Sequence, residues 1–351
     1  MRLYDQPFRS TLRYERMAIA ITPTRTFTNV QLEQYRQIGD PPADAVIATV
    51  VAEGGREGVG TLMRWLATNT DVYTTGQPAV VQQFFVDFAH LPTWANPAQM
   101  RRGMDFYQRH IGVIGLILGT FSLPYTYLGA NGVQLLWLTD RIRTDTARRL
   151  LETGEWVFAV NDPKNWGTSS KAILYTLKIR LIHAASRWFG LHTGRWNIDW
   201  GMPVCQEDMV GTIGSFGYIV LRGLRKMGVS MTSQEEEDYL HHINVVGYLN
   251  GVAQELLPQN LREAYHLDKL ISQRQFQPSE AGVGLTKALL DTIAKQAGSD
   301  NARNLAAAQM RFFLGNGHAD ALGIPDVPVE ARLMSVVSRL PIFPKLIPSI
   351  V

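Results

Sequence analysis

The sequence lacks the pattern of a half-buried β-strand: no run of six or more residues alternates cleanly between polar and apolar side chains. No Asn-Gly turn joins two such runs either. Apolar residues recur instead at helical spacing, as Val81, Phe84, Phe85 and Phe88 do. The sequence therefore predicts an all-α protein, with roughly a dozen or more helices at the ~11-residue mean length.

Composition sets limits on the class of protein. With 46% hydrophobic and 19% charged residues, a chain of 351 residues can bury a large core, as one extended domain or two closely packed ones. The formal charge is +3 and the basic residues are scattered among acidic ones, so no nucleic-acid partner is expected. The single cysteine, Cys205, excludes an internal disulfide and is interpreted as buried packing.

Two features bear on location. The first seven residues have neither the apolar segment of a signal peptide nor a twin-arginine pair, which favours a cytoplasmic protein. Residues 111–138 carry no charge, and a bilayer span needs about 20 predominantly apolar residues. Pro124 and several polar side chains interrupt this stretch, so we expect two buried helices with a turn at Leu123 and Pro124, and no transmembrane segment.

The coarse order of helices follows from periodicity, caps and breakers. Thr28 opens a short helix, the glycines between 54 and 60 mark a helix end, and Thr232 with Glu235 forms a capping box. Residues 315–328 are expected to be a loop, and the proline-containing tail 340–351 no regular helix. Further helices are expected at residues 80–90, 99–109, 144–160, 169–190, 207–227, 260–275, 286–296 and 301–313.

The helix at 169–190 carries an unusual polar stripe. Thr176, Arg180, His183 and Arg187 follow one another in steps of four, three and four, which places them on one helix face. The same segment is rich in leucine and isoleucine, and an uncompensated charge in apolar surroundings is costly. The stripe therefore predicts an anionic partner for its arginines.

Several kinds of site lack their usual pattern. There is no HExxH pair or cysteine cluster for zinc, and Glu235, Glu236 and Glu237 are adjacent rather than spaced for a di-iron bundle. Neither GxSxG nor a Walker A loop occurs, and the glycines at 54–60 do not form GxGxxG. For His241 and His242 we expect one exposed and one half-buried ring.

The remaining polar residues suit haem b. The haem iron binds a neutral imidazole, and the propionates pair with cationic side chains. A hydrogen-bond donor on the oxygen-binding face stabilises bound oxygen. Arg149 and Thr153 lie four residues apart and so share a helix face. Purely structural interpretations stay open. His183 can be a hydrogen-bonded core residue, and the stripe arginines can be exposed with their aliphatic stems along the helix. Arg149 can be a surface residue and Thr153 a packed one.

Residues 149–187 resemble a known signature. Arg-x-x-x-Thr is followed by Val-Phe-Ala-Val and then by Arg-Leu-Ile-His-Ala-Ala-Ser-Arg. This is similar to the family of rubber oxygenase (latex-clearing protein) and mpaB-type oxygenases. Gly-Asp-Pro-Pro-Ala-Asp-Ala at residues 39–45, and the segments 217–228, 246–252 and 319–325, also resemble family segments. The resemblance covers roughly residues 38–325.

The resemblance implies a globin-related helical core that holds one haem b. His183 would be the axial iron ligand, flanked by Arg180 and Arg187. Arg149 and Thr153 would be the catalytic pair beside the cofactor, and Arg311 a further cofactor-binding residue. It also implies a single haem-binding domain over residues 38–325, between an N-terminal arm, 1–37, and a C-terminal extension, 326–351.

The chain departs from rubber oxygenase at two positions of interest. Glu152 stands where that enzyme has a lysine able to reach the iron, and residues 129–138 contain no acid to match its glutamate base. A twin-arginine export signal is also absent, and polyisoprene is an extracellular polymer too large to enter a cell. We therefore expect a small hydrophobic, unsaturated molecule as the substrate, with dioxygen as co-substrate. The expected function is a haem b-dependent oxygenase, of dioxygenase or peroxygenase type. The alternatives are a non-catalytic haem protein (gas sensor or haem carrier) and a haem-free, lipid-binding helical protein; peripheral membrane contact and oligomeric state stay open.

Overall fold

A computed structural model describes residues 25–68, 74–138, 146–167 and 170–327. Helices make up almost all of the regular structure in these ranges, and the only β-type pairing among them is an isolated bridge between Gly129 and Phe276. The prediction of an all-α fold is therefore confirmed.

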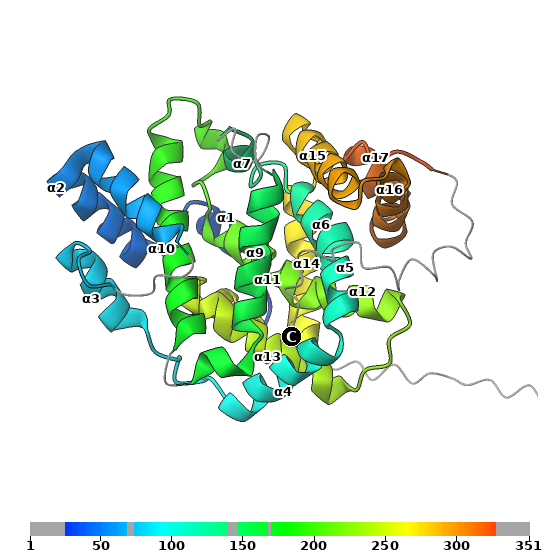
Figure 1. Ribbon diagram of the computed structural model, residues 1–351, viewed down its shortest axis with the longest axis horizontal. Helices are drawn as coiled ribbons and strands as arrows, with labels where there is room; N and C mark the ends of the chain where they lie inside the picture. The colour runs from blue at the N-terminus through cyan, green and yellow to red at the C-terminus, as the bar shows by residue number, and fades with distance from the viewer. Residues whose placement is uncertain (1–24, 69–73, 139–145, 168–169, 328–351) are drawn as a thin grey trace, which may run out of the picture.

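Helix α10 (Lys171–Leu191) lies between two apolar cores and belongs to both. Ile173, Leu177 and Leu181 face the smaller core, which α2 (Pro41–Leu66) and α3 (Ala79–Phe88) complete. Ala172 and Tyr175 face the larger core, beside α9 (Thr146–Val160). Figure 1 shows α10 with α2 and α3 on one side and α9 on the other. Because α10 is apolar on both sides, its polar stripe has to find partners inside the protein.

The larger core is organised around the packing of α4 (Pro97–Arg109) along α13 (Ser233–Leu249). A Cβ at Gly103 would lie 2.6 Å from the Asp238 carbonyl oxygen, so glycine permits this close approach. The other elements are α1 (Asn29–Arg36), α5 (Ile111–Ile117), η1 (Leu118–Ser122), α6 (Leu123–Tyr127), α7 (Gln134–Leu138), η2 (Pro163–Trp166), η3 (Ile198–Trp200), α11 (Gln206–Phe216), α12 (Tyr218–Lys226), η4 (Gln254–Leu256), α14 (Leu261–Gln275), α15 (Glu280–Ala297), α16 (Asp300–Leu314) and α17 (Asn316–Ala321).

Side-chain caps explain where several of these helices begin. Thr28 accepts the backbone N–H of Gln31 at the start of α1, as expected. The capping box of Thr232 and Glu235 is present at the start of α13. The Asn260 side chain caps α14 by accepting the backbone N–H groups of Arg262 and Glu263. These starts are local properties of the chain, which is why the sequence predicts them well.

The uncharged stretch does not turn at Leu123 and Pro124 as expected. Helix α5 passes through the π-helical η1 directly into α6, with Pro124 in the first turn of α6. A π-helical turn shifts the hydrogen-bond register, and a proline near a helix start removes an N–H that has no helical partner anyway. In the parts of the chain described, no helix combines the length and apolar character that a membrane span needs.

Other boundaries also need correction. The predicted helix end among the glycines at 54–60 falls at Gly55, which leaves the helical conformation with φ of 60° and ψ of −157°, but a second helical segment of α2 follows it at once. Gly217 divides the expected helix 207–227 into α11 and α12. Helix α15 begins at Glu280 rather than 286, and α17 occupies part of the expected loop 315–328. The expected starts at 144 and 169 and the tail 340–351 lie outside the described residues.

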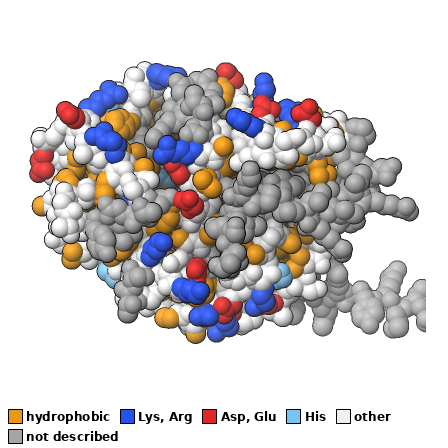
Figure 2. Space-filling view, viewed as in Figure 1, with side chains coloured by type: hydrophobic (Ala, Val, Ile, Leu, Met, Phe, Trp, Pro, Cys, Tyr) orange, Lys and Arg blue, Asp and Glu red, His pale blue; other side chains and the backbone are white. Residues whose placement is uncertain are grey.

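The described part of the N-terminal arm is docked on the protein. Arg36, at the end of α1, is almost fully buried; it donates from Nε to the Trp200 carbonyl at 2.8 Å and pairs with Asp208. Cys205 is buried nearby, as expected. On the face shown in Figure 2, basic and acidic side chains are interspersed.

Candidate functional site

His183 lies in the middle of α10 and makes no hydrogen bond with the described residues. Its Nδ1 atom is buried without a partner. Burial, followed by the positive charges of Arg187 and Arg149, lowers the pKa of His183 to about 4, whereas the charge of Asp40 opposes this shift. The ring is therefore a neutral imidazole at neutral pH, and its buried Nδ1 atom has no partner in the described part of the chain.

Arg180, one turn before His183, is buried and paired with Asp40. Its Nε and Nη2 atoms donate to the two carboxylate oxygens at 2.6 and 2.8 Å, a side-on pair with two parallel hydrogen bonds. The guanidinium carbon also lies 4.5 Å from the centroid of the Phe88 ring. Asp40 stands immediately before α2, so this pair fixes the start of α2 against α10.

Arg187, one turn after His183, is held in a similar way. Its Nε atom donates to Asp44 Oδ1 at 2.8 Å, and Nη1 donates to the Val204 carbonyl at 2.5 Å. Val204 has a φ of 49°, a strained conformation for a β-branched residue, and this hydrogen bond helps to hold it. Nη2 of Arg187 is buried without a partner.

The anionic partners that the stripe predicts thus include two carboxylates of the chain itself. Asp40 and Asp44 bracket His183 through Arg180 and Arg187. Each guanidinium keeps one terminal nitrogen without a hydrogen bond to the described residues: Nη1 of Arg180 and Nη2 of Arg187. Binding of haem propionates by the two arginines therefore stays a prediction, and only these two nitrogens are available for it.

Helix α9 brings Arg149 and Thr153 to the same region. Both side chains are partly buried, and the charge of Arg149 reaches His183. Trp156, two turns after Arg149, donates from its indole nitrogen to Thr176 Oγ1 on α10 at 3.1 Å, which fixes α9 on α10. Glu152 pairs with Arg148 instead, at 2.9 Å, so it accepts a hydrogen bond along α9.

Arg311 does not join this group. It lies on α16, where it pairs with Asp320 at 2.5 Å and donates to the carbonyls of Ile324 and Pro325. Figure 1 places α16 on the side of the molecule opposite α2 and α3, well away from α10. The structure thus supports a role for Arg311 in holding the chain after α17.

His242 corrects an expectation and is a residue that sequence reasoning missed. It is fully buried because α4 and Trp166 cover this side of α13. Neither ring nitrogen makes a hydrogen bond of normal geometry with the described residues, although the Val160 backbone interacts with the ring. Burial lowers its pKa to about 3. His241 is partly buried and its Nε2 accepts the backbone N–H of Asn96 at 2.9 Å.

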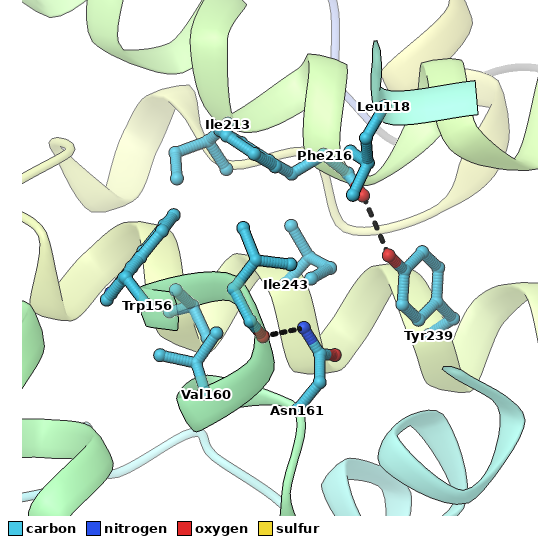
Figure 3. Close-up of a pocket in the computed structure, with 10 residues that line it drawn as sticks. Leu118, Trp156, Val160, Asn161, Ile213, Phe216, Tyr239 and Ile243 are labelled. Carbon is cyan, nitrogen blue, oxygen red and sulfur yellow. Dashed lines mark hydrogen bonds between the residues drawn. The ribbon is translucent and has the colours of Figure 1, made fainter. Parts of the chain in front are cut away.

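A small cavity of about 10 Å³ lies between α9, α11 and α13. Figure 3 shows Trp156 and Val160 on one side and Ile213, Phe216 and Ile243 on the other. Its volume matches about one water molecule, far below that of a porphyrin. This cavity is therefore too small to hold such a cofactor.

Comparison with known proteins identifies the family. Residues 113–340 match the model of the catalytic domain of ER-bound oxygenase mpaB/B'/Rubber oxygenase. The chain belongs to this family. A rubber oxygenase of Streptomyces sp. (strain K30) is 25% identical over 302 residues, which cover 85% of this chain and 74% of that protein. The structure of latex clearing protein LCP in the closed state has a TM-score of 0.70 at 24% identity, over 90% of this chain and 85% of the other, and so shares the fold. This member of the mpaB/rubber oxygenase family is thus an oxygenase.

Proposed function

We propose that the protein is a haem b-dependent oxygenase, of dioxygenase or peroxygenase type, with His183 as the axial iron ligand. The observation that carries this proposal is the state of His183: a neutral imidazole without a hydrogen bond to the described residues, on an interior helix between two ion-paired arginines. Iron takes imidazole in its neutral form, so the low pKa suits this role.

The surrounding donors fit the anionic edge of such a cofactor. Nη2 of Arg187 is a buried donor without a partner, and a buried donor of this kind costs free energy unless something accepts from it. Arg149 adds positive charge near His183. When bound, haem b supplies an iron centre able to activate dioxygen. The chain's own contribution would be to hold His183 neutral and to offer Nη2 of Arg187 to a propionate.

We further propose that Arg149 and Thr153 face the reacting molecules from α9. Arg149 would supply a fixed positive charge, and the Thr153 hydroxyl a hydrogen-bond donor. The side chain of Glu152 accepts from Arg148 and does not replace the lysine of rubber oxygenase. A small hydrophobic, unsaturated molecule is the substrate class that we assign, with dioxygen as the second substrate.

An absorption spectrum tests the cofactor. Protein expressed with adequate haem should show a Soret band, and His183→Ala should shift or abolish it. His192→Ala is the matched control, because His192 is an exposed histidine at the end of the same helix. No Soret band in the unmodified protein, or an unchanged spectrum in His183→Ala, would reject the proposal.

Oxygen consumption tests the reaction. The reduced protein should consume dioxygen when an unsaturated apolar compound is added, and Arg149→Gln or Thr153→Val should slow this consumption while the Soret band is retained. Haem binding without substrate-dependent consumption by any such compound would contradict the assigned substrate class.

A further inference from the structure

A cleft of about 350 Å³ opens beside the ion pair of Arg180 and Asp40. This volume lies in the range of small-molecule sites, which are roughly 300–1,000 Å³ and lined mainly by apolar side chains with a few polar groups. The apolar part of the wall includes Ile38, Pro42, Phe88 and Val252. The cleft begins at Arg180, one helical turn from His183. It is separate from the small cavity, and Arg180 is the one residue of the polar stripe that lines it.

The wall of the cleft is rigidly built. Gly251 has a φ of 91°, and a Cβ there would lie 2.2 Å from Asp40 Oδ2 and 2.7 Å from Arg180 Nε. The backbone after α13 therefore presses directly on the ion pair. Gln206 ties the same segment to α2: its Nε2 donates to the carbonyls of Gly39 and Gly251, and its Oε1 accepts from the Ala253 N–H.

Two donors on this wall have no hydrogen-bond partner among the described residues. Arg180, more than nine-tenths buried, uses Nε and Nη2 for Asp40 and keeps Nη1. The Tyr248 hydroxyl is the second such group, on a ring that packs edge-on against Trp94. A ligand in the cleft can thus receive a hydrogen bond from a charged donor that is already held in position.

The local charge favours an uncharged ligand. Asp40 balances the charge of Arg180, and Glu255 at the rim adds a negative charge that accepts from Tyr35. An anionic ligand would be repelled by two carboxylates, whereas a carbonyl oxygen would accept from Nη1 without adding charge.

We propose that this cleft binds a largely apolar, uncharged molecule through one carbonyl or hydroxyl oxygen, which accepts from Nη1 of Arg180. Because the cleft lies one turn from His183, we assign this molecule as the substrate of the oxygenase. Only that assignment rests on the proposed function; binding in the cleft does not require haem.

Ligand-observed NMR with three eight-carbon probes tests the proposal: octan-2-one, oct-1-ene and octanoate. Octan-2-one should bind about tenfold or more tightly than the other two, since a hydrogen bond to a charged group is worth that much. Arg180→Lys should reduce octan-2-one binding to the level of oct-1-ene. Arg102→Lys is the matched control, because Arg102 of α4 forms the same two-bond pair with Asp238 outside the cleft, and it should leave binding unchanged.

Equal affinity for ketone and alkene, tighter binding of octanoate, or unchanged binding in Arg180→Lys would overturn the proposal. Should Arg180→Lys fail to fold, Ala253→Trp tests the location instead, because it fills the cleft and should abolish octan-2-one binding. Ala98→Trp, at an exposed position of α4, is its control. Binding that survives Ala253→Trp would also overturn the proposal. A missing Soret band would reject the haem proposal and leave these binding results unaffected.

Discussion

The Arg180 guanidinium lies side-on against the Asp40 carboxylate, 140 residues earlier in the chain, with hydrogen bonds of 2.6 and 2.8 Å. Both side chains are less than a tenth exposed. The pair joins the start of α2 to the helix that carries His183 and forms one wall of the cleft. It therefore links the packing of α2 on α10 to the wall of the cleft.

Removing the charge of Asp40 should destabilise the protein strongly. Asp40→Asn leaves Arg180 buried without a counter-charge, and breaking one partner of a buried pair costs about 3–5 kcal/mol. Urea unfolding followed by circular dichroism measures the change. Asp105→Asn is the control: its pair with Arg101 is exposed, and such pairs contribute about 0–1 kcal/mol. Similar losses in both variants would contradict the prediction.

Gly251→Ala should destabilise the protein more than Gly298→Ala. Both glycines have positive φ, 91° and 62°, so an added Cβ costs about 1–2 kcal/mol at either position. Only at Gly251 would this Cβ also collide with Asp40 and Arg180, because nothing lies within 4 Å of a Cβ at Gly298. Thermal unfolding of the two variants makes the comparison, and an equal loss would show that the ion pair can move aside.

Buried neutral histidines should make the protein sensitive to acid. The pKa of His242 is lowered from 6.5 to about 3, so between these values the unfolded chain binds more protons than the folded one. Stability therefore falls as pH drops below 6.5, by at most about 1.4 kcal/mol per pH unit for this residue. His242→Phe should flatten the dependence between pH 4 and 6.5, measured by urea unfolding, whereas His266→Phe, at an exposed position, should not. An equally steep dependence in His242→Phe would show that the buried ring is not responsible.

Thr176→Val should loosen α9 on α10. The substitution removes the acceptor of the Trp156 indole N–H, both groups being buried, and an unpaired buried donor costs about 1–3 kcal/mol. Thr49→Val is the control, because the Thr49 hydroxyl bonds only within α2 on the surface, and surface changes usually stay within about 0.5 kcal/mol. Chemical denaturation monitored by tryptophan fluorescence measures both, and equal effects would argue against the interhelical bond.

The parts of the fold that depend on local sequence could be predicted. Caps such as Thr28 and Thr232 act within one helical turn, and apolar spacing places α3, α4 and α16 to within a few residues. The errors arose where tertiary packing outweighs local preference. Pro124 does not form the expected turn, because it is buried in the first turn of α6, directly after a π-helical segment.

The sequence predicted which polar side chains share a face of α10, but not which residues they pair with. The stripe on α10 pointed to an anionic partner, and the Gly-Asp-Pro-Pro-Ala-Asp segment was recognised as similar to the family. Nothing in the spacing connects Asp40 with Arg180 or Asp44 with Arg187, because these pairs depend on how α2 packs across α10. His242 escaped prediction for the same reason: its burial comes from α4 and Trp166, not from its own helix.

The two ion pairs specify one register of α2 on α10. Four residues separate Asp40 from Asp44, about 6 Å of helix, whereas seven separate Arg180 from Arg187, about 10.5 Å. Because the two intervals differ, sliding α2 by one turn could restore at most one pair and would leave the other charges buried and apart. Apolar packing alone would tolerate such a slip more readily. The unequal spacing therefore fixes the axial position of His183 on α10 relative to α2.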